Sequence, residues 1–301
     1  MLKDSQHGST NGGKKGGKNM RFLMQSLAPQ RVLSIFAGML AESRVVWLKN
    51  MLIRYFLGKF KINMAEAVDS DPYAYASFNE LFTRHLQLTA REIASAKDLL
   101  VSPADGTIAQ LGYLQNDLIL QAKGKNFKLP ELLGGDVIDA TIFNGGAFAT
   151  IYLAPPDYHR VHMPMTGQLL QMVYVPGRLF SVNKATTDAI PDLFGRNERV
   201  ISIFATEHGK MAVILVGAML VGSINTAWAG TINPKHKVPL LSKHYPSTLD
   251  QQILLHKGEE LGHFKMGSTA IVLMERDRVV WNNALAVGSK VQFGQAIGTI
   301  V

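Results

Sequence analysis

His263-Phe264-Lys265-Met266-Gly267-Ser268-Thr269-Ala270 is the stretch around which the C-terminal part of this chain is organised. It follows a polar segment and leads into the apolar run 270–274, so it predicts a turn that enters a buried strand. Glycine leaves the carbonyl of Gly267 sterically open, and Ser268 places a hydroxyl beside it. A second Gly-Ser-Thr at residues 8–10 shows that this tripeptide is weak on its own, so its context decides what it does.

The chain around this stretch is rich in short strands. From about Leu99 onward, apolar or alternating runs are separated by Gly, Pro and Asp, which is typical of β-structure. The most apolar run, residues 211–224, contains two glycines and is too short to span a bilayer, so we interpret it as two buried strands. Strands are expected at residues 108–112, 118–122, 148–153, 168–175, 200–204, 211–216, 219–224, 270–274, 279–281 and 296–301.

The N-terminal part has a helical pattern instead. Apolar residues recur at spacings of three and four over residues 30–42 and 44–62, and a third helix is expected over residues 77–92, with Ser77 as its N-cap. The sequence therefore predicts an α+β protein, in which N-terminal amphipathic helices precede a β-rich domain of sandwich or barrel-like form. We divide the chain into a disordered tail (1–19), a helical membrane-associating region (20–98) and the β-rich domain (99–301).

Charge is unevenly distributed along the chain. The net charge is +8, yet residues 1–63 hold eleven Lys and Arg against two acids, so the remainder is about neutral. A basic N-terminal segment followed by a nearly neutral remainder favours attachment to an anionic membrane over nucleic-acid binding. Cationic helices with aromatics such as Trp47 and Tyr55 are typical of the membrane interface, although a helix pair packed on the protein's own core stays open. The chain has no cysteine, which excludes disulfides and a thiol nucleophile.

Three polar segments stand out in the β-rich part: Pro103-Ala104-Asp105-Gly106, Asp157-Tyr158-His159-Arg160-Val161-His162-Met163-Pro164, and Gly267-Ser268. An acid in a turn often bonds only its own backbone. Two histidines three apart suggest a metal, but in a strand His159 and His162 point to opposite faces, so we expect no metal site.

Asp105, His162 and Ser268 supply the residue types of an acid–base–nucleophile triad, which is recognised by roles and not by spacing. Serine hydrolases usually carry the nucleophile in Gly-x-Ser-x-Gly, but here residue 266 is Met and residue 270 is Ala. A hydrolase is therefore disfavoured, and the residues alone leave the purpose of Ser268 open.

Separated motifs in a fixed order carry a family resemblance from about residue 30 to residue 301. They are Phe78-Asn79-Glu80-Leu81-Phe82-Thr83-Arg84, the two polar segments at 103–106 and 157–164, Tyr174-Val175-Pro176-Gly177 with Leu179-Phe180-Ser181-Val182-Asn183, Asn197-Glu198-Arg199, Trp228-Ala229-Gly230-Thr231-Ile232, and Phe264-Lys265-Met266-Gly267-Ser268-Thr269. In these the chain resembles the bacterial phosphatidylserine decarboxylases, which depend on a pyruvoyl group. It departs from them at Met266, where the family usually has Leu, and in residues 1–19.

The resemblance implies a chemistry for the three segments. His162, oriented by Asp105, would deprotonate Ser268, which attacks the Gly267 carbonyl; the chain would then split into a β subunit (1–267) and an α subunit (268–301). Ser268 would become the pyruvoyl cofactor, whose ketone forms a Schiff base with the substrate amine. His159, with a pKa near its ordinary value, would be the acid that protonates the carbanion. The strands after Ser268 would have to be interleaved with those before it.

The resemblance also implies partners: phosphatidylserine, an anionic membrane surface and a homodimer of αβ units, with the enzyme peripheral at the cytoplasmic face of the inner membrane. Two alternatives stay open. One is another pyruvoyl-dependent decarboxylase acting on a soluble amino acid or a different serine phospholipid. The other is a non-catalytic membrane-binding or carrier-like module in which Gly267-Ser268 is only a turn.

Overall fold

The computed structural model describes residues 30–115, 118–121, 125–187, 190–218, 223–232, 240–246, 248, 250–265 and 268–301. Several of the sequence-based predictions fall wholly or partly on other residues, among them the start of the region predicted over 20–98 and the end of the strand expected at 118–122. The tail predicted over residues 1–19 and Gly267 of the expected cleavage bond lie outside the described residues, as does most of the strand expected at 219–224.

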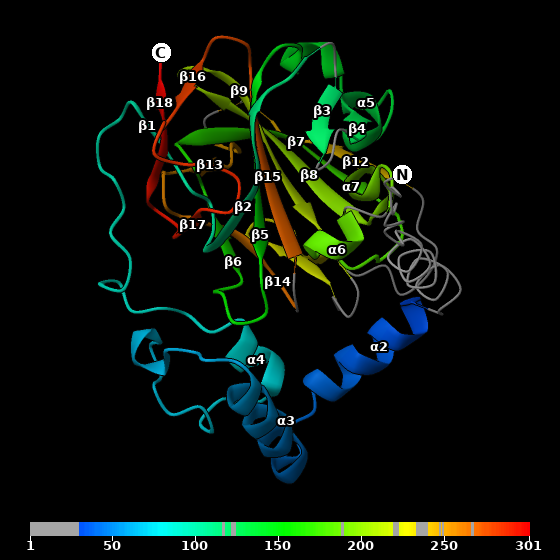
Figure 1. The fold of residues 1–301 in the computed structure, drawn as a ribbon, viewed down its shortest axis with the longest axis vertical. Coiled ribbons are helices and arrows are strands. Elements are labelled where there is room, and N and C mark those ends of the chain that lie inside the picture. Colours follow the sequence, from blue (N-terminus) through cyan, green and yellow to red (C-terminus); the bar gives the residue numbers. More distant parts are fainter. Residues whose placement is uncertain are drawn as a thin grey trace, which may run out of the picture.

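Two helices open the described chain, close to the predicted ranges: α2 (Gln30–Ala41) and α3 (Val46–Lys59). Together with the short α4 (Phe78–Phe82) they form a layer below the β-rich part (Figure 1). Burial of aromatic and aliphatic side chains stabilises this layer by about 1.5–3 kcal/mol for each large side chain. Its buried members are Ala41, Ile53, Phe56, Phe78, Leu81 and Phe82.

Helix α4 is shorter than the sequence predicts. Ser77 caps it as expected, because its Oγ accepts a backbone N–H of the first turn, but the helix ends at Phe82. The next carbonyl, that of Thr83, accepts the Nε–H of Arg160 in the β-rich part at 2.8 Å. This tertiary contact draws the chain away from the helix axis, so the helix predicted over residues 77–92 is wrong beyond its first turns.

The centre of the β-rich part is one large antiparallel sheet. Its strand order is β12-β7-β8-β9-β15-β5-β2-β17, and β13 also pairs with β7. The bounds are β12 (Leu241–His244), β7 (Gly167–Val175), β8 (Arg199–Thr206), β9 (Gly209–Val216), β15 (Ser268–Met274), β5 (Ala147–Leu153), β2 (Gly106–Tyr113), β17 (Lys290–Val291) and β13 (Leu254–Leu255).

Smaller elements cover both faces of this sheet. The three smaller sheets have the orders β1-β18-β16, β11-β10-β14-β6 and β3-β4. The strands are β1 (Leu99–Val101), β18 (Ala296–Ile300), β16 (Val279–Trp281), β11 (Gly230–Ile232), β10 (Ile224–Thr226), β14 (Glu260–Phe264), β6 (Arg160–His162), β3 (Leu118–Gln121) and β4 (Lys125–Lys128). The short helices are the 3₁₀ helices η1 (Met64–Glu66) and η3 (Ala140–Phe143), with α5 (Leu129–Leu132), α6 (Lys184–Thr187) and α7 (Leu193–Arg196).

The core has two sides, separated by the large sheet. On one side Ala270 and Val272 of β15 pack with residues of the two smaller sheets that contain β18 and β14. On the other side Ile271 and Leu273 pack with residues of α5, α7 and η3. The predicted α+β class and sandwich-like layering are confirmed, and the sheets are open in the part of the chain that the structure describes, so the barrel-like alternative is not realised.

Strand β15 lies in the middle of the large sheet, between β5 and β9. All seven of its residues are buried, and each pairs with β5. Strands β17 and β18 also pair with strands from earlier in the sequence, β2 and β1, and β16 pairs with β18. The segment that follows Ser268 is therefore interleaved with the rest of the fold, as the sequence predicted. Among the helices of the described ranges, none is long and apolar enough to cross a membrane.

Candidate active site

Ser268 is the first residue of β15, where it pairs with Leu153 of β5. Its side chain is fully buried, and its Oγ has no hydrogen-bond partner within the described part of the chain. Leaving a buried hydroxyl unpaired costs about 1–3 kcal/mol, so native structures rarely do so without a functional reason. Because side chains alternate along a strand, Ser268 faces the same side of the sheet as Ala270 and Val272.

His159 lies just before β6 and is completely buried. Its Nδ1 lies 2.7 Å from the carbonyl oxygen of Asp157, and its ring packs on Phe82 with centroids 4.1 Å apart. A carbonyl only accepts, so Nδ1 carries the proton and Nε2 presents a lone pair. That Nε2 is buried and is without a partner among the residues described. Burial lowers the pKa of His159 to about 3, so the ordinary value assumed from the sequence is wrong.

His162 is held at both ring nitrogens. Nδ1 lies 2.8 Å from the carbonyl oxygen of Gly258, which fixes the proton there, and Nε2 accepts the Tyr158 hydroxyl at 3.2 Å. The Phe293 ring stacks on the imidazole with centroids 3.9 Å apart and planes 8° apart. Burial lowers the pKa of His162, so this ring is neutral near pH 7 with its lone pair on Nε2.

Asp105 makes other contacts than the sequence predicted. Its carboxylate accepts the Nη2–H of Arg91 at 2.6 Å, the Nε–H of the same side chain, and the backbone N–H of Phe293 at 2.9 Å. No hydrogen bond joins Asp105 to His162, although both residues are described. The carbonyl of Gly258 orients the imidazole instead, and Phe293 lies between the two predicted partners.

Two backbone segments bring the serine and the histidines into one region. Phe264 N–H donates to the carbonyl of His159, His263 pairs with Arg160, and Ser268 pairs with Leu153, so the chain on both sides of residues 154–158 lies beside the β14 end and the β15 start. The ends of β5, β6 and β14 lie near α4 (Figure 1).

A charged network fixes the outer edge of this region. Arg160 Nη1 donates to both oxygens of Glu260, at 2.7 and 2.8 Å, and His263 Nδ1 lies 2.9 Å from Glu260 Oε1. Burial alone would raise the pKa of Glu260, but the hydrogen bonds from His263 and Arg160 lower it to about 2. Glu260 is therefore ionised near neutral pH, and the strand pair β6–β14 is fastened at this point.

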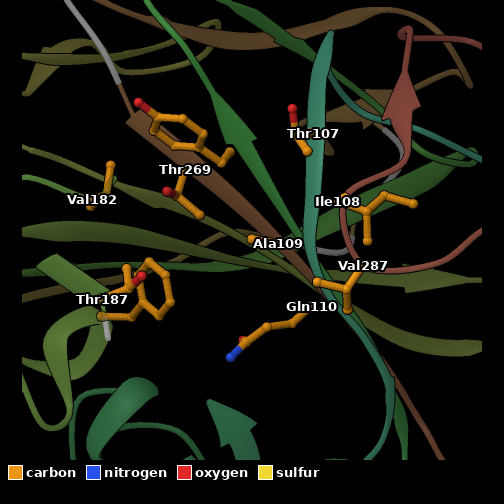
Figure 2. Close-up of a pocket in the computed structure, with 11 residues that line it drawn as sticks. Thr107, Ile108, Ala109, Gln110, Val182, Thr187, Thr269 and Val287 are labelled. Carbon is orange, nitrogen blue, oxygen red and sulfur yellow. The ribbon is translucent and has the colours of Figure 1, made fainter. Parts of the chain in front are cut away.

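Two cavities border the region. One, of about 270 Å³, is polar and lies between the N-terminal layer and the β-rich part, with Arg84, Asp105 and Tyr158 in its wall. The other, of about 160 Å³, is mainly apolar and contains Thr269, so it lies across the sheet from the Ser268 side chain. Figure 2 shows Val182 and Thr187 on one side of this second cavity, and Thr107, Ile108 and Val287 on the other.

Sequence reasoning missed several residues of the site. Tyr158 and Arg84 lie within motifs that the sequence displays, but neither received a role. Arg91, Gly258 and Phe293 carry no local signal, because each reaches the site only through the tertiary fold. In the described ranges, no group of three or more His, Cys, Asp or Glu is placed to hold a metal ion.

Comparison with known proteins gives a consistent result. The family model described as phosphatidylserine decarboxylase matches residues 78–299, and a model described as PSD matches residues 21–61. The chain is 50% identical over 275 residues to a phosphatidylserine decarboxylase proenzyme of Pseudomonas fluorescens (strain Pf0-1), covering 91% of this chain and 96% of the relative. It is 48% identical over 282 residues to that of Azotobacter vinelandii, covering 93% and 98%.

Proposed function

The chain belongs to the phosphatidylserine decarboxylase family, and from this premise we propose how its own residues carry out self-processing and catalysis. It is a proenzyme that cuts itself into two chains and converts phosphatidylserine to phosphatidylethanolamine and CO₂. The enzymes of this family use a pyruvoyl group made from a serine. The assignment of roles to individual residues is our proposal.

Ser268 is the serine that becomes the pyruvoyl group. The observation that carries this assignment is its fully buried Oγ, which has no hydrogen-bond partner among the described residues, at the first position of the central strand. A serine that is consumed in one intramolecular reaction needs no permanent partner. The strand behind it, paired on both sides, holds the new N-terminus in place after the chain is cut.

His162 is the base for self-processing. Once the hydrogen bond from the Tyr158 hydroxyl is given up, the Nε2 lone pair takes the proton of Ser268 Oγ as that oxygen attacks the carbonyl carbon of Gly267, and the peptide bond becomes an ester. Elimination of the ester then releases the Gly267 carboxylate, and hydrolysis of the remaining dehydroalanine releases ammonia. The bond from His162 Nδ1 to Gly258 supports this role, because it keeps the lone pair on Nε2.

Asp105 assists His162 without touching it. Its negative charge raises the tendency of His162 to take up a proton, although burial is the larger effect and lowers it. Arg91 holds the carboxylate in place, and Phe293 connects it mechanically to the imidazole. We therefore keep Asp105 in the processing machinery as an electrostatic and positioning residue.

The pyruvoyl group supplies an electron sink for the charge that CO₂ leaves on Cα of the substrate. His159 moves the proton. Its Nε2 is unprotonated near pH 7 and has no partner among the described residues, so it must take up a proton before it can deliver one to Cα. His159 can donate a proton only after its Nε2 has been protonated. Its low pKa then favours transfer of that proton to the substrate.

The N-terminal helices attach the enzyme to the membrane. Trp47 and Tyr55 on α3 are 69% and 67% exposed, and basic residues of the same region favour an anionic leaflet. We place the enzyme at the cytoplasmic face of the inner membrane as a peripheral protein. We also expect a homodimer of αβ units, and sedimentation of the detergent-free enzyme would test this oligomeric state. The other exposed apolar side chains of α2, α3 and the turn between them are Ile35, Phe36, Met39, Val45, Val46 and Met51.

Release of CO₂ from vesicles tests the substrate. With carboxyl-labelled phosphatidylserine in anionic vesicles, the purified enzyme should release labelled CO₂, and free serine at the same concentration should give little. Faster release from free serine would instead favour a pyruvoyl-dependent decarboxylase of soluble amino acids. Vesicle binding by an intact chain without CO₂ release would favour a non-catalytic membrane module.

A further inference from the structure

Arg84 is a buried cation that makes no direct ion pair within the described part of the chain. Its side chain follows helix α4, the residue is 5% exposed, and its Nε is buried without a partner. No ion pair joins its guanidinium to an acid of the described residues. Burial lowers the pKa of Arg84, and the nearby charges of Asp105 and Glu66 oppose this, but guanidinium groups stay charged at neutral pH, so the charge is desolvated and without a direct partner.

The cavity beside Arg84 has other acids, but each is already paired. Arg91 binds Asp105 at 2.6 Å and Glu66 at 2.8 Å, and Lys290 lies 3.5 Å from Asp157. The about 270 Å³ of space in front of Arg84 is also lined by the donors of Asn63, Tyr158, Lys290 and Gln292. The three cations and three acids around this cavity balance, but Arg84 differs from Arg91 and Lys290 in making no direct ion pair within the described residues. It faces a cavity that is large enough for a small anion and open to polar contacts.

Arg84 is also close to the catalytic histidine. Its charge is near enough to His159 to lower the pKa of that residue, and it acts in the same way on the Tyr158 hydroxyl. Phe82, two residues earlier, packs on the His159 ring. An anion bound at Arg84 would therefore lie near His159 and Tyr158.

We propose that Arg84 binds the phosphodiester of the substrate headgroup. Phosphatidylserine offers two anions, a carboxylate and a phosphodiester, and Cα is joined to the phosphodiester through only a methylene and an ester oxygen. The carboxylate loses its charge as CO₂ leaves, so a guanidinium on it would stabilise the ground state over the transition state. The phosphodiester keeps its charge throughout, and planar guanidinium groups match it geometrically.

This proposal rests on the proposed function, and kinetics with soluble dihexanoyl-phosphatidylserine test it. Arg84→Gln should still process, and should raise KM about tenfold or more while kcat stays within about threefold, because a charge-assisted contact to a charge present in both states is lost. Arg84→Lys should lie between. Arg278→Gln, an exposed arginine in a turn, is the control and should match the wild type. An unchanged KM, or a fall in kcat alone, would overturn the proposal.

Inhibition by inorganic phosphate distinguishes binding of the lipid headgroup at Arg84 from binding of a free anion that acts as an effector. It should inhibit the wild type competitively with the lipid, and Arg84→Gln should weaken this inhibition by a similar factor. Inhibition that is not competitive, or no inhibition, would contradict binding of the headgroup at this cavity.

A binding measurement covers the case in which Arg84→Gln does not process. Ser268 does not line the cavity, so the site should exist in the uncut Ser268→Ala chain. Calorimetry should show that this chain binds glycerophosphoserine, and that adding Arg84→Gln weakens binding about tenfold or more. No binding, or equal binding by both chains, would refute the role of Arg84. A wild-type protein that never matures would refute the proposed function, but it would not affect the binding result.

Discussion

The ring of Phe293 lies flat on the imidazole of His162, with centroids 3.9 Å apart and planes 8° apart. The backbone N–H of the same phenylalanine donates to Asp105 at 2.9 Å. Asp105 and His162, which the sequence suggested as a directly bonded pair, are thus joined through one residue of the C-terminal segment. If the chain is cut before Ser268 as we propose, that segment becomes the α subunit and both subunits contribute to the proposed processing site.

Loss of the Phe293 ring should slow self-processing. Phe293→Leu keeps the amide bond to Asp105 but removes the stacking surface, and Asp105→Asn removes the charge. We expect each to slow cleavage about tenfold or more, as followed by the loss of full-length chain with time after synthesis. Because both act on His162 through one route, the double variant should be slower by less than the product of the two effects.

An unaltered cleavage rate in Phe293→Leu would show that the stacking contact has no role. Fully multiplicative effects in the double variant would show that Asp105 acts on His162 by a path that does not include Phe293.

The two histidines should separate processing from catalysis. His159→Gln should mature fully but release CO₂ about a hundredfold more slowly or worse, because positioned proton transfer contributes that much or more. His162→Gln should remain uncut, because it lacks the base at Nε2. Gel analysis gives the first readout and CO₂ release the second. Full activity in His159→Gln, or complete maturation of His162→Gln, would contradict the assignment.

His159 should make the fold less stable in acid. Its pKa is about 3 in the folded state and about 6.5 when unfolded, so between these values the unfolded chain binds the extra proton. Stability is therefore full above about pH 6.5 and falls as the pH drops below it, by up to about 1.4 kcal/mol per pH unit. Urea unfolding of the uncut Ser268→Ala chain at pH 7 and pH 5 measures this.

Between pH 7 and pH 5, the free energy of unfolding should fall by about 2 kcal/mol less in the Ser268→Ala/His159→Gln chain than in the Ser268→Ala chain. Glu260 and His162 are present in both chains, so their contributions cancel. An identical pH dependence in the two chains would mean that His159 is not buried as a neutral ring.

Trp47 should anchor the enzyme to anionic lipid. It is 69% exposed on α3, and insertion of a large aromatic side chain contributes about 1.5–3 kcal/mol. Trp47→Ser should weaken binding to phosphatidylglycerol vesicles about tenfold in a sedimentation assay, and added salt should weaken it further. Val280→Ser is the matched control, since Val280 is 53% exposed on β16 of the β-rich part. Equal losses in the two variants would argue against attachment through α3.

The fold was predictable wherever the signal was local. The spacing of apolar residues located α2 and α3, and the apolar run after Ser268 located the central strand β15. Helix α4 shows the limit of such signals, because a contact from Arg160 to the backbone of Thr83 ends it after five residues.

For the candidate site, the sequence suggested residues whose roles stay predictions, and it did not display their contacts. The motifs pointed to His159, His162 and Ser268, and the structure brings their segments together. A sequence does not display burial, so the pKa of His159 was set at its ordinary value. Nor does it display which long-range neighbour is nearest, so Gly258 and Phe293, which hold His162, went unnoticed.

The mass of the purified protein tests the central claim most directly, namely that Ser268 is converted to a pyruvoyl group by self-cleavage. Two chains are expected, residues 1–267 and 268–301. The shorter one should be lighter than a serine-initiated peptide, because a ketone and a methyl group replace an amine and a hydroxymethyl group. Ser268→Ala should give one uncut chain. A wild-type protein found only at full length, or a short chain that begins with an ordinary serine, would contradict it.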